Sequence, residues 1–326
     1  MPLRKNRFLT WAITLWAILA GCLVTDFLCV SMDSGLPLTG GTRPGIRRIR
    51  GRSFYGNLNS TCRGAMNTTI GFIGTGNIAT AVVEGLLTAP GPAPNILVSP
   101  RNAGKAATLA ARFSEVKVAA DNQAVIDGSR WVFLSIRPQA AREVLKPLRF
   151  DAGQKIISLI PVPRSALASW VSPAERIYRV LPLPTCAHHI GAVPYWPNDE
   201  NVHGLMARLG QPMPLSAEHE LSVLWAATAM IAPFYSLLET VSRWSAEQGV
   251  HPATAADFTA AMFHALATVA QAGAPERFVH LAAEAATPGG LNEQAEGMLR
   301  TGGAFQHVGK ALDAILTRIS QPPATS

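Results

Sequence analysis

The chain has 326 residues, of which 48% are hydrophobic and 15% charged, a composition that excludes a disordered protein and leaves room for two domains. Its four cysteines have no paired spacing, so they support neither a metal site nor a disulfide framework, and a reducing compartment is the simpler expectation. The formal net charge of +7 lies largely in the N-terminal extension, and the rest of the chain has no basic stripe with interleaved aromatic residues, so we expect no nucleic-acid partner.

Residues 1–65 form this N-terminal extension. Residues 1–31 have a basic start, an apolar run over residues 8–30 and a segment, Leu19 to Cys22, that is similar to a lipoprotein cleavage box. Taken alone, this pattern indicates export or membrane anchoring, whereas residues 32–65 are a Gly/Arg/Ser-rich linker without periodicity. Because Met66 directly precedes the first predicted strand, we expect translation to start there and the protein to be cytoplasmic. The alternative, if residues 1–31 are translated, is a protein anchored in a membrane.

The segment from Thr69 to Thr80 has the pattern of a dinucleotide-binding turn. A short apolar strand runs into a Gly-x-Gly-x-x-Ala sequence, and apolar residues then repeat at helical spacing. In such a turn the first glycine allows the bend, the second lets the backbone approach a pyrophosphate, and the alanine lets the helix pack on the strand. The alternative is a small-residue turn of another α/β fold. The turn residues predicted to bind the cofactor are Gly74, Thr75, Gly76, Asn77, Ile78 and Ala79.

The second predicted strand, residues 96–98, leads to the position that distinguishes NADH from NADPH. Dinucleotide-binding domains that prefer NAD place a carboxylate there for the ribose hydroxyls, and residues 99–105 contain none. Ser99, Arg101 and Asn102 are predicted instead to hold a 2′-phosphate, with Lys105 nearby, since a planar guanidinium suits phosphate oxygens. The predicted cofactor is NADPH, and NADH remains possible if the two cations are merely solvated.

Helices and strands alternate beyond this point, as a doubly wound sheet requires. The pattern predicts a helix over residues 103–112, a helix that opens at Pro138, and strands over residues 116–119, 131–136, 155–160 and 176–180. Strand-poor, alanine-rich segments at 217–248, 252–272, 275–286 and 305–319 are predicted as helices. The expected fold class is thus an α/β Rossmann-type doubly wound sheet followed by an all-α C-terminal domain. We expect a dinucleotide-binding domain over residues 66–165, a connecting strand and loop region over 166–215, and a helical domain over 216–326.

A second anion site is predicted in the helical region, at Thr287-Pro-Gly-Gly290. Consecutive N–H groups at a helix N-terminus bind an anion without a charged side chain.

With these segments in place, the chain resembles the pyrroline-5-carboxylate reductase family, which reduces a cyclic imine to proline with a nicotinamide cofactor. The resemblance runs from Met66 to about Ile319 and depends on five motifs, residues 71–87, 135–139, 179–182, 247–250 and 287–290. In the family, the last motif opens a helix whose backbone amides hold the substrate carboxylate. The resemblance therefore implies cofactor contacts at Ile136, Arg137 and Pro138, and substrate contacts at Thr287, Pro288, Gly289, Gly290, Leu291 and Asn292. It also implies a homodimer in which the C-terminal helices of two subunits interleave.

The departures from the family concern the substrate. Asn292 stands where the family has a threonine that hydrogen-bonds the imine nitrogen, so the resemblance makes it the candidate catalytic residue. An amide can make such a bond, although a helix N-terminal amide can equally well satisfy backbone groups. Leu291 makes the pocket more apolar, and Glu293 is expected to favour the positive end of the helix rather than to act in catalysis.

The function expected from these residues is the NADPH-dependent reduction of 1-pyrroline-5-carboxylate to L-proline by hydride transfer to a small imine that carries a carboxylate. The alternative is a diverged NADP-binding paralogue that acts on another imine or serves as a non-catalytic sensor. A β-hydroxyacid dehydrogenase is disfavoured, because that class relies on a lysine in its first long helix and this chain has none between Lys155 and Lys310.

Overall fold

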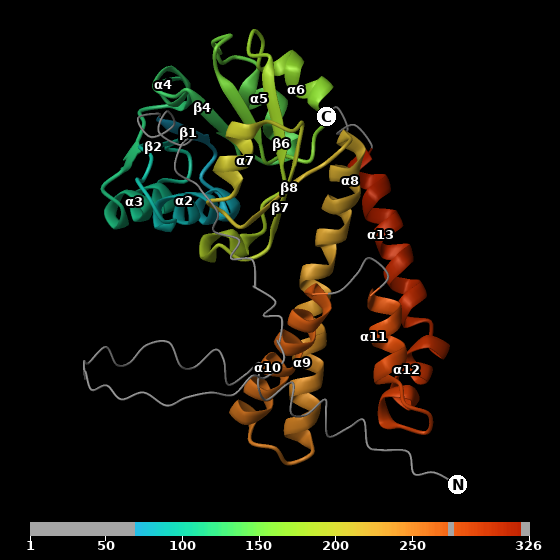
Figure 1. The fold of residues 1–326 in the computed structure, drawn as a ribbon. Coiled ribbons are helices and arrows are strands. Elements are labelled where there is room, and N and C mark those ends of the chain that lie inside the picture. The colour runs from blue at the N-terminus through green and yellow to red at the C-terminus, as the bar shows by residue number, and fades with distance from the viewer. Residues whose placement is uncertain (1–68, 273–276, 321–326) are drawn as a thin grey trace, which may run out of the picture. The chain divides into compact units, whose positions relative to one another are not determined.

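The computed structural model describes residues 69–272 and 277–320 (Figure 1). The expectations for residues 1–65 and for a start at Met66 lie outside the described residues. The strands are β1 (Ile70–Ile73), β2 (Ile96–Val98), β3 (Val116–Val118), β4 (Trp131–Leu134), β5 (Lys155–Ser158), β6 (Arg176–Val180), β7 (Ala192–Trp196) and β8 (Gln211–Pro214). The helices between them are α2 (Asn77–Thr88), α3 (Ala103–Arg112), α4 (Asn122–Asp127), α5 (Pro138–Leu145), α6 (Arg164–Trp170), the 3-10 helix η2 (Pro184–His188) and α7 (Glu200–Met206).

The strands form one sheet in the order β3-β2-β1-β4-β5-β6-β7-β8, in which all neighbours are parallel except β6 and β7. Side chains of one strand point alternately to the two faces of a sheet. Accordingly, Phe72 and Phe133 stack with ring centroids 4.7 Å apart in one buried cluster, with residues of α2, α3 and α7. Ile73 and Leu134 lie in the other, with residues of α4, α5 and α6. Helices thus cover both faces, and the expected doubly wound fold is confirmed.

The sheet continues beyond residue 165, where we expected the first domain to end, because β6, β7 and β8 of the expected connecting region pair with it. Periodicity did not reveal β7 and β8 because they contain prolines, which break ladder hydrogen bonds and are tolerated mainly at sheet edges. Three predicted strands end one or two residues early, at Val118, Leu134 and Ser158. The apolar residues that follow them pack in loops at the carboxyl edge of the sheet.

The C-terminal part is helical, as expected (Figure 1, orange to red). It contains α8 (Glu218–Ala227), the 3-10 helix η3 (Thr228–Met230), α9 (Ile231–Glu247), α10 (Pro252–Gln271), α11 (Arg277–Ala285), α12 (Leu291–Thr301) and α13 (Ala304–Ser320). The single helix expected over residues 217–248 is interrupted by η3. Pro233 explains the interruption, since it has no N–H to donate and lies in the first turn of α9, where that loss is tolerated.

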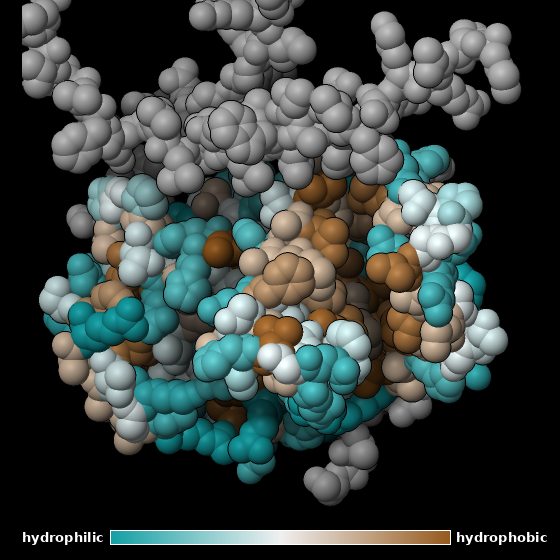
Figure 2. Space-filling model, turned by 90° about the horizontal axis from the view of Figure 1, so that it is seen from below, coloured by the Kyte–Doolittle hydropathy of each residue, from teal (hydrophilic) through white to brown (hydrophobic). Residues whose placement is uncertain are grey.

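These helices expose many large apolar side chains. Phe258 of α10 is 66% exposed and Leu291 of α12 is 84% exposed. Among the described residues of α9, α11, α12 and α13, none is buried. Figure 2, a view from below, shows hydrophobic residues gathered on the surface among polar ones. Exposed apolar area of this extent marks a surface that another protein or a membrane covers.

One stretch of the described residues, Glu218–Glu247, contains an 18-residue window with a mean hydropathy of 1.6 and is by length and composition able to cross a membrane. It comprises α8, η3 and α9, and α8 packs against α13. Length and composition alone are a weak indication of a membrane span, because a helix that packs against another subunit has the same properties.

Candidate functional site

The predicted dinucleotide turn lies at the carboxyl edge of the sheet, where β1, β2 and β4 end. Gly74 has a φ of +96°, a conformation that side chains disfavour, and a Cβ there would lie 2.3 Å from the carbonyl oxygen of Ser135. The Gly74 N–H donates to Ser99 Oγ (2.8 Å), and Thr75 Oγ1 donates to the Ser99 carbonyl oxygen (2.9 Å). Both bonds hold the turn against the end of β2, which Ser99 follows.

The N-terminus of α2 has the properties of a phosphate site. Gly76 is the N-cap, no side chain caps the helix, and its first turn contains no acidic residue. The first intrahelical bond runs from the Thr80 N–H to the Gly76 carbonyl oxygen (3.0 Å), so the N–H groups of residues 77–79 remain available for an anion. A Cβ at Gly76 would meet nothing within 4 Å, which leaves open space over the turn.

Ser135, which sequence reasoning did not single out, supports the same interpretation. It follows β4 and touches the turn at Gly74, and its buried Oγ has no hydrogen-bond partner within residues 69–272 and 277–320. A buried hydroxyl without a partner is costly, so a ligand atom that supplies one would be stabilised there. Its only sequence signal was its place in a motif at the end of a strand.

The three residues predicted for the 2′-phosphate differ in their surroundings. Arg101 and Asn102 are exposed beside the N-terminus of α3, whereas Ser99 is fully buried and its hydroxyl accepts the bond from Gly74. The Ser99 hydroxyl therefore supports the turn in this structure, and its contact with a 2′-phosphate stays a prediction. Lys105 places a second cation near the start of α2, where its Nζ donates to Asn77 Oδ1.

The last predicted cofactor contacts open α5. Ile136 packs beside Gly74, Arg137 is the exposed N-cap of the helix, and Pro138 occupies its first turn. All three lie at the same edge of the sheet as the turn, since they follow β4.

The predicted anion loop forms a tight turn before α12. The Gly290 N–H donates to the Thr287 carbonyl oxygen (2.8 Å), and Gly289 has a φ of +73°. Gly290 is the N-cap and has no side-chain capping bond, and the first intrahelical bond runs from the Gln294 N–H to the Gly290 carbonyl oxygen (3.2 Å). The N–H groups of residues 291–293 are therefore available, as in α2. Pro288 and Leu291 of the predicted substrate site are both exposed here.

Two side chains of α12 turn back, one onto the end of α11 and one onto this loop. Asn292 Nδ2 donates to the Ala285 carbonyl oxygen (3.2 Å), and Glu293 Oε2 accepts from the Gly289 N–H (2.7 Å). The amide of Asn292 thus satisfies a backbone group, one of the two alternatives that the sequence left open. Glu293 lies at the positive end of the helix, as its position in the first turn predicted.

The predicted residues form two groups. Hydrogen bonds link members of the dinucleotide turn with one another, and the same holds for the anion loop. Among the residues that the structure describes, no hydrogen bond or ion pair joins the first group to the second.

Arg179, in one of the motifs, connects the sheet to the helical part. Its guanidinium is buried, pairs with Glu218 of α8 (2.8 Å) and lies over the Trp225 ring, with the guanidinium carbon 4.8 Å from the ring centroid. Burial lowers the pKa of Arg179, and the charge of Glu218 opposes that shift. Glu218 also accepts from the Arg164 N–H (2.6 Å), so this one carboxylate contacts two elements of the sheet domain.

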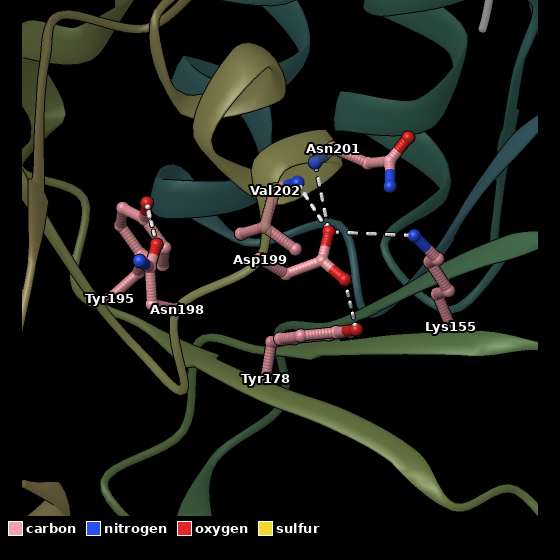
Figure 3. Close-up of polar contacts among 7 residues, drawn as sticks. All are labelled: Lys155, Tyr178, Tyr195, Asn198, Asp199, Asn201 and Val202. Carbon is pink, nitrogen blue, oxygen red and sulfur yellow. Dashed lines mark hydrogen bonds and ion pairs between the residues drawn. The ribbon is translucent and has the colours of Figure 1, made fainter. Parts of the chain in front are cut away.

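A polar cluster that sequence reasoning missed surrounds Asp199 (Figure 3). Asp199 Oδ2 accepts from Tyr178 Oη (2.8 Å), and its Oδ1 accepts from the N–H groups of Asn201 and Val202 and lies 3.6 Å from Lys155 Nζ. Burial alone would raise the pKa of Asp199, but these hydrogen bonds and the lysine charge outweigh it and leave the pKa lowered. Burial and the bond to Asp199 raise the pKa of Tyr178 to about 12. Because Lys155 begins β5, the cluster lies away from the carboxyl edge and serves to fasten α7 to the sheet.

Two family models match the chain. Residues 69–161 match the model described as NADP oxidoreductase coenzyme F420-dependent, and residues 218–321 match the model described as pyrroline-5-carboxylate reductase dimerisation. The second match covers the helices with the exposed apolar side chains, and it supports homo-oligomerisation.

The chain matches individual relatives over nearly the whole of their length. A pyrroline-5-carboxylate reductase of Pseudomonas aeruginosa is 26% identical over 263 residues, which are 77% of this chain and 96% of that protein. The structure of a pyrroline-5-carboxylate reductase from Coxiella burnetii has a TM-score of 0.65 at 25% identity and covers 79% of this chain and 100% of its own. The structure of the Plasmodium falciparum pyrroline carboxylate reductase with NADP bound has a TM-score of 0.69 at 15% identity, covers 79% and 99%, and is a likeness of fold.

Proposed function

Because the chain belongs to the pyrroline-5-carboxylate reductase family, we propose that it reduces 1-pyrroline-5-carboxylate to L-proline with NADPH. The family comprises NAD(P)H-dependent oxidoreductases that act on CH–NH groups. The observation that carries the proposal is the presence, in one chain, of two helix N-termini with available N–H groups, one after the Gly-x-Gly turn and one after the Thr-Pro-Gly-Gly loop. The first suits a pyrophosphate and the second a substrate carboxylate.

The cofactor is NADPH, which supplies the hydride when it is bound. The N–H groups after Gly76 suit its pyrophosphate, and Arg101 with Lys105 suits its 2′-phosphate. Ile136 and Pro138 border the same edge of the sheet. No acidic residue lies in the first turn of α2 to repel the phosphates.

The substrate-binding residues bind and orient the imine and do not transfer a proton to it. The loop from Thr287 to Gly290 holds the carboxylate through backbone N–H groups, and Asn292 bonds to the imine nitrogen. To do so, the Asn292 side chain leaves the carbonyl oxygen of Ala285 that it contacts at 3.2 Å. Hydride transfer to the carbon of an imine that is already protonated on nitrogen gives the amine directly, so it needs little more than such positioning and the exclusion of water.

The active form is a homodimer in the cytoplasm. Exposed apolar side chains on the C-terminal helices and the match to a dimerisation model support a subunit interface there. If each pocket combines the dinucleotide turn of one subunit with helices of its partner, a dimer also explains why no hydrogen bond or ion pair joins the two groups among the described residues.

The test is to follow NADPH oxidation by the purified protein with 1-pyrroline-5-carboxylate, with NADH in parallel. Turnover that favours NADPH is the expected result. Cofactor binding without turnover of this substrate would contradict the proposed substrate, and a panel of other cyclic imines would then decide between a different reductase and a non-catalytic protein.

A further inference from the structure

A carboxylate of this chain already binds the anion loop. Glu293 is the acidic residue in the first turn of α12, and its Oε2 lies 2.7 Å from the Gly289 nitrogen. The loop between Gly289 and Glu293 is therefore partly satisfied by an internal anion, in the same way that a substrate carboxylate would satisfy it.

The bond leaves part of the loop available. The Gly290 N–H is used by the Thr287 carbonyl oxygen, and the N–H groups of residues 291–293 are not used within the helix. A substrate carboxylate that binds these groups would lie within a few ångströms of the Glu293 carboxylate, because that carboxylate spans the same turn. Two negative charges would then share one helix N-terminus.

We propose that Glu293 is a specificity-determining residue, which weakens the binding of imines that carry a carboxylate relative to imines without one. The inference rests on the proposed function, since it assigns the anion loop to the substrate. The chemical consequence is a shift in preference towards cyclic imines without a carboxylate. Such an imine meets no repulsion from Glu293 when it is neutral, and it is attracted when it is protonated.

The expected size of the effect follows from the exposure of the site. Glu293 is exposed in the subunit, so solvent screens its charge, and repulsion between two such charges at close range corresponds to about a five-fold change in binding. The bond to Gly289 also stabilises the helix, because an acidic residue near a helix N-terminus is favourable in its own right. An informative variant therefore has to remove the charge and keep a hydrogen-bond acceptor.

The experiment compares Glu293→Gln with the wild-type protein, because glutamine retains an acceptor oxygen for the Gly289 N–H. The quantity measured is kcat/KM for 1-pyrroline-5-carboxylate divided by kcat/KM for 1-pyrroline, which has no carboxylate. Glu293→Gln is expected to raise this ratio about five-fold, mainly through a lower KM for the carboxylate substrate. The matched control is Glu296→Gln, which removes the same charge one turn along α12, where Glu296 pairs with Arg300. An equal ratio in the two variants would overturn the proposal.

A binding measurement separates this inference from the proposed function. Calorimetric titration of L-proline into each protein with NADP⁺ present needs no turnover, and tighter binding to Glu293→Gln than to Glu296→Gln is expected even if neither imine is reduced. That result would sustain the role of Glu293 while the proposed reaction fails. Equal proline affinities, or no proline binding to either variant, would overturn it.

Discussion

Gly74 and Gly76 are two residues apart, and they serve different purposes in the turn. Gly74 has a positive φ and lies against the Ser135 carbonyl oxygen, so the fold itself requires a glycine there. Gly76 has an ordinary φ of −85° and faces open space, so the folded protein has no need of a glycine. Under the proposed function, the requirement for a glycine at position 76 comes from the ligand.

We therefore predict that Gly76→Val folds normally but loses NADPH. The added side chain would meet the pyrophosphate rather than the protein, and the dissociation constant should rise more than about ten-fold, a cost above about 1.4 kcal/mol. Fluorescence titration with NADPH and thermal unfolding without it would be measured together. Gly74→Ala is the contrasting variant, because it should lower Tm before any ligand is added. A Gly76→Val protein with unchanged NADPH affinity would remove the turn from the cofactor site.

Arg101 is predicted to distinguish the two nicotinamide cofactors. Arg101→Ala removes a charge-assisted hydrogen bond to the 2′-phosphate, worth about 1.5–3 kcal/mol, so NADPH should bind about ten-fold or more weakly. NADH lacks that phosphate and should lose less than about two-fold. Parallel titrations with both cofactors provide the measurement, and equal losses would contradict the assignment.

Asn292 is predicted to act on turnover rather than on cofactor binding. Asn292→Ala should lower kcat about ten-fold through loss of a hydrogen bond to the imine and leave the NADPH dissociation constant unchanged. Steady-state kinetics and a titration would be measured on the same preparation. Unchanged kcat would leave only the bond to Ala285, and Asn292 would then be structural.

At the scale of elements, α7 depends on one aspartate. Asp199 caps the helix, bonds to Tyr178 of β6 and lies near Lys155 of β5, so it links three elements. This site was not predictable from periodicity, because its partners are 21 and 44 residues away in sequence.

Asp199→Asn is predicted to lower the free energy of unfolding at neutral pH by about 1–2 kcal/mol, since a charge-assisted hydrogen bond becomes a neutral one. The folded pKa of Asp199 is lowered, so its stabilisation is fully present above the ordinary aspartate value of 3.8 and is lost as the pH falls through the lower folded value. The difference between variant and wild type should therefore be constant at neutral pH and shrink below pH 3.8. Denaturant unfolding across this range is the measurement. Asp121→Asn is the control. Asp121 caps α4 through a single bond from the Ala124 N–H, so this variant should lower the free energy of unfolding by less.

Local sequence predicted the bounds of some helices and strands but not of others. Residues 96–98 and 103–112 were predicted with the bounds that the structure has, because β-branched and alanine-rich runs there agree with their surroundings. β7 and β8 were missed because their prolines argue locally against strands. Pairing with β6 and with each other overrides that preference.

At the scale of the whole molecule, the C-terminal helices expose the apolar surface that a subunit interface would bury. Phe258→Lys on α10 is predicted to shift the protein towards a monomer and to lower reductase activity, because a charge there would be buried without a partner. Sedimentation at several protein concentrations is the measurement. Ala168→Lys, at an exposed position of α6 in the sheet domain, adds the same charge and should leave the oligomer intact. A variant dimer as stable as the wild type would place the interface elsewhere.

The sequence by itself determined the doubly wound fold and the helical C-terminal part, and it predicted the cofactor turn and the anion loop, because each depends on residues that are close together in the chain. Glycine spacing, strand composition and helical periodicity are local properties, so they can be recognised without coordinates. Tertiary structure decided which side chains are free to meet a ligand. It buried Ser99 beneath Gly74, left the hydroxyl of Ser135 without a partner in the described part of the chain, and brought Glu293 onto the anion loop. These outcomes depend on distances that a linear pattern does not specify, since burial and hydrogen bonding are set by how the elements and turns pack.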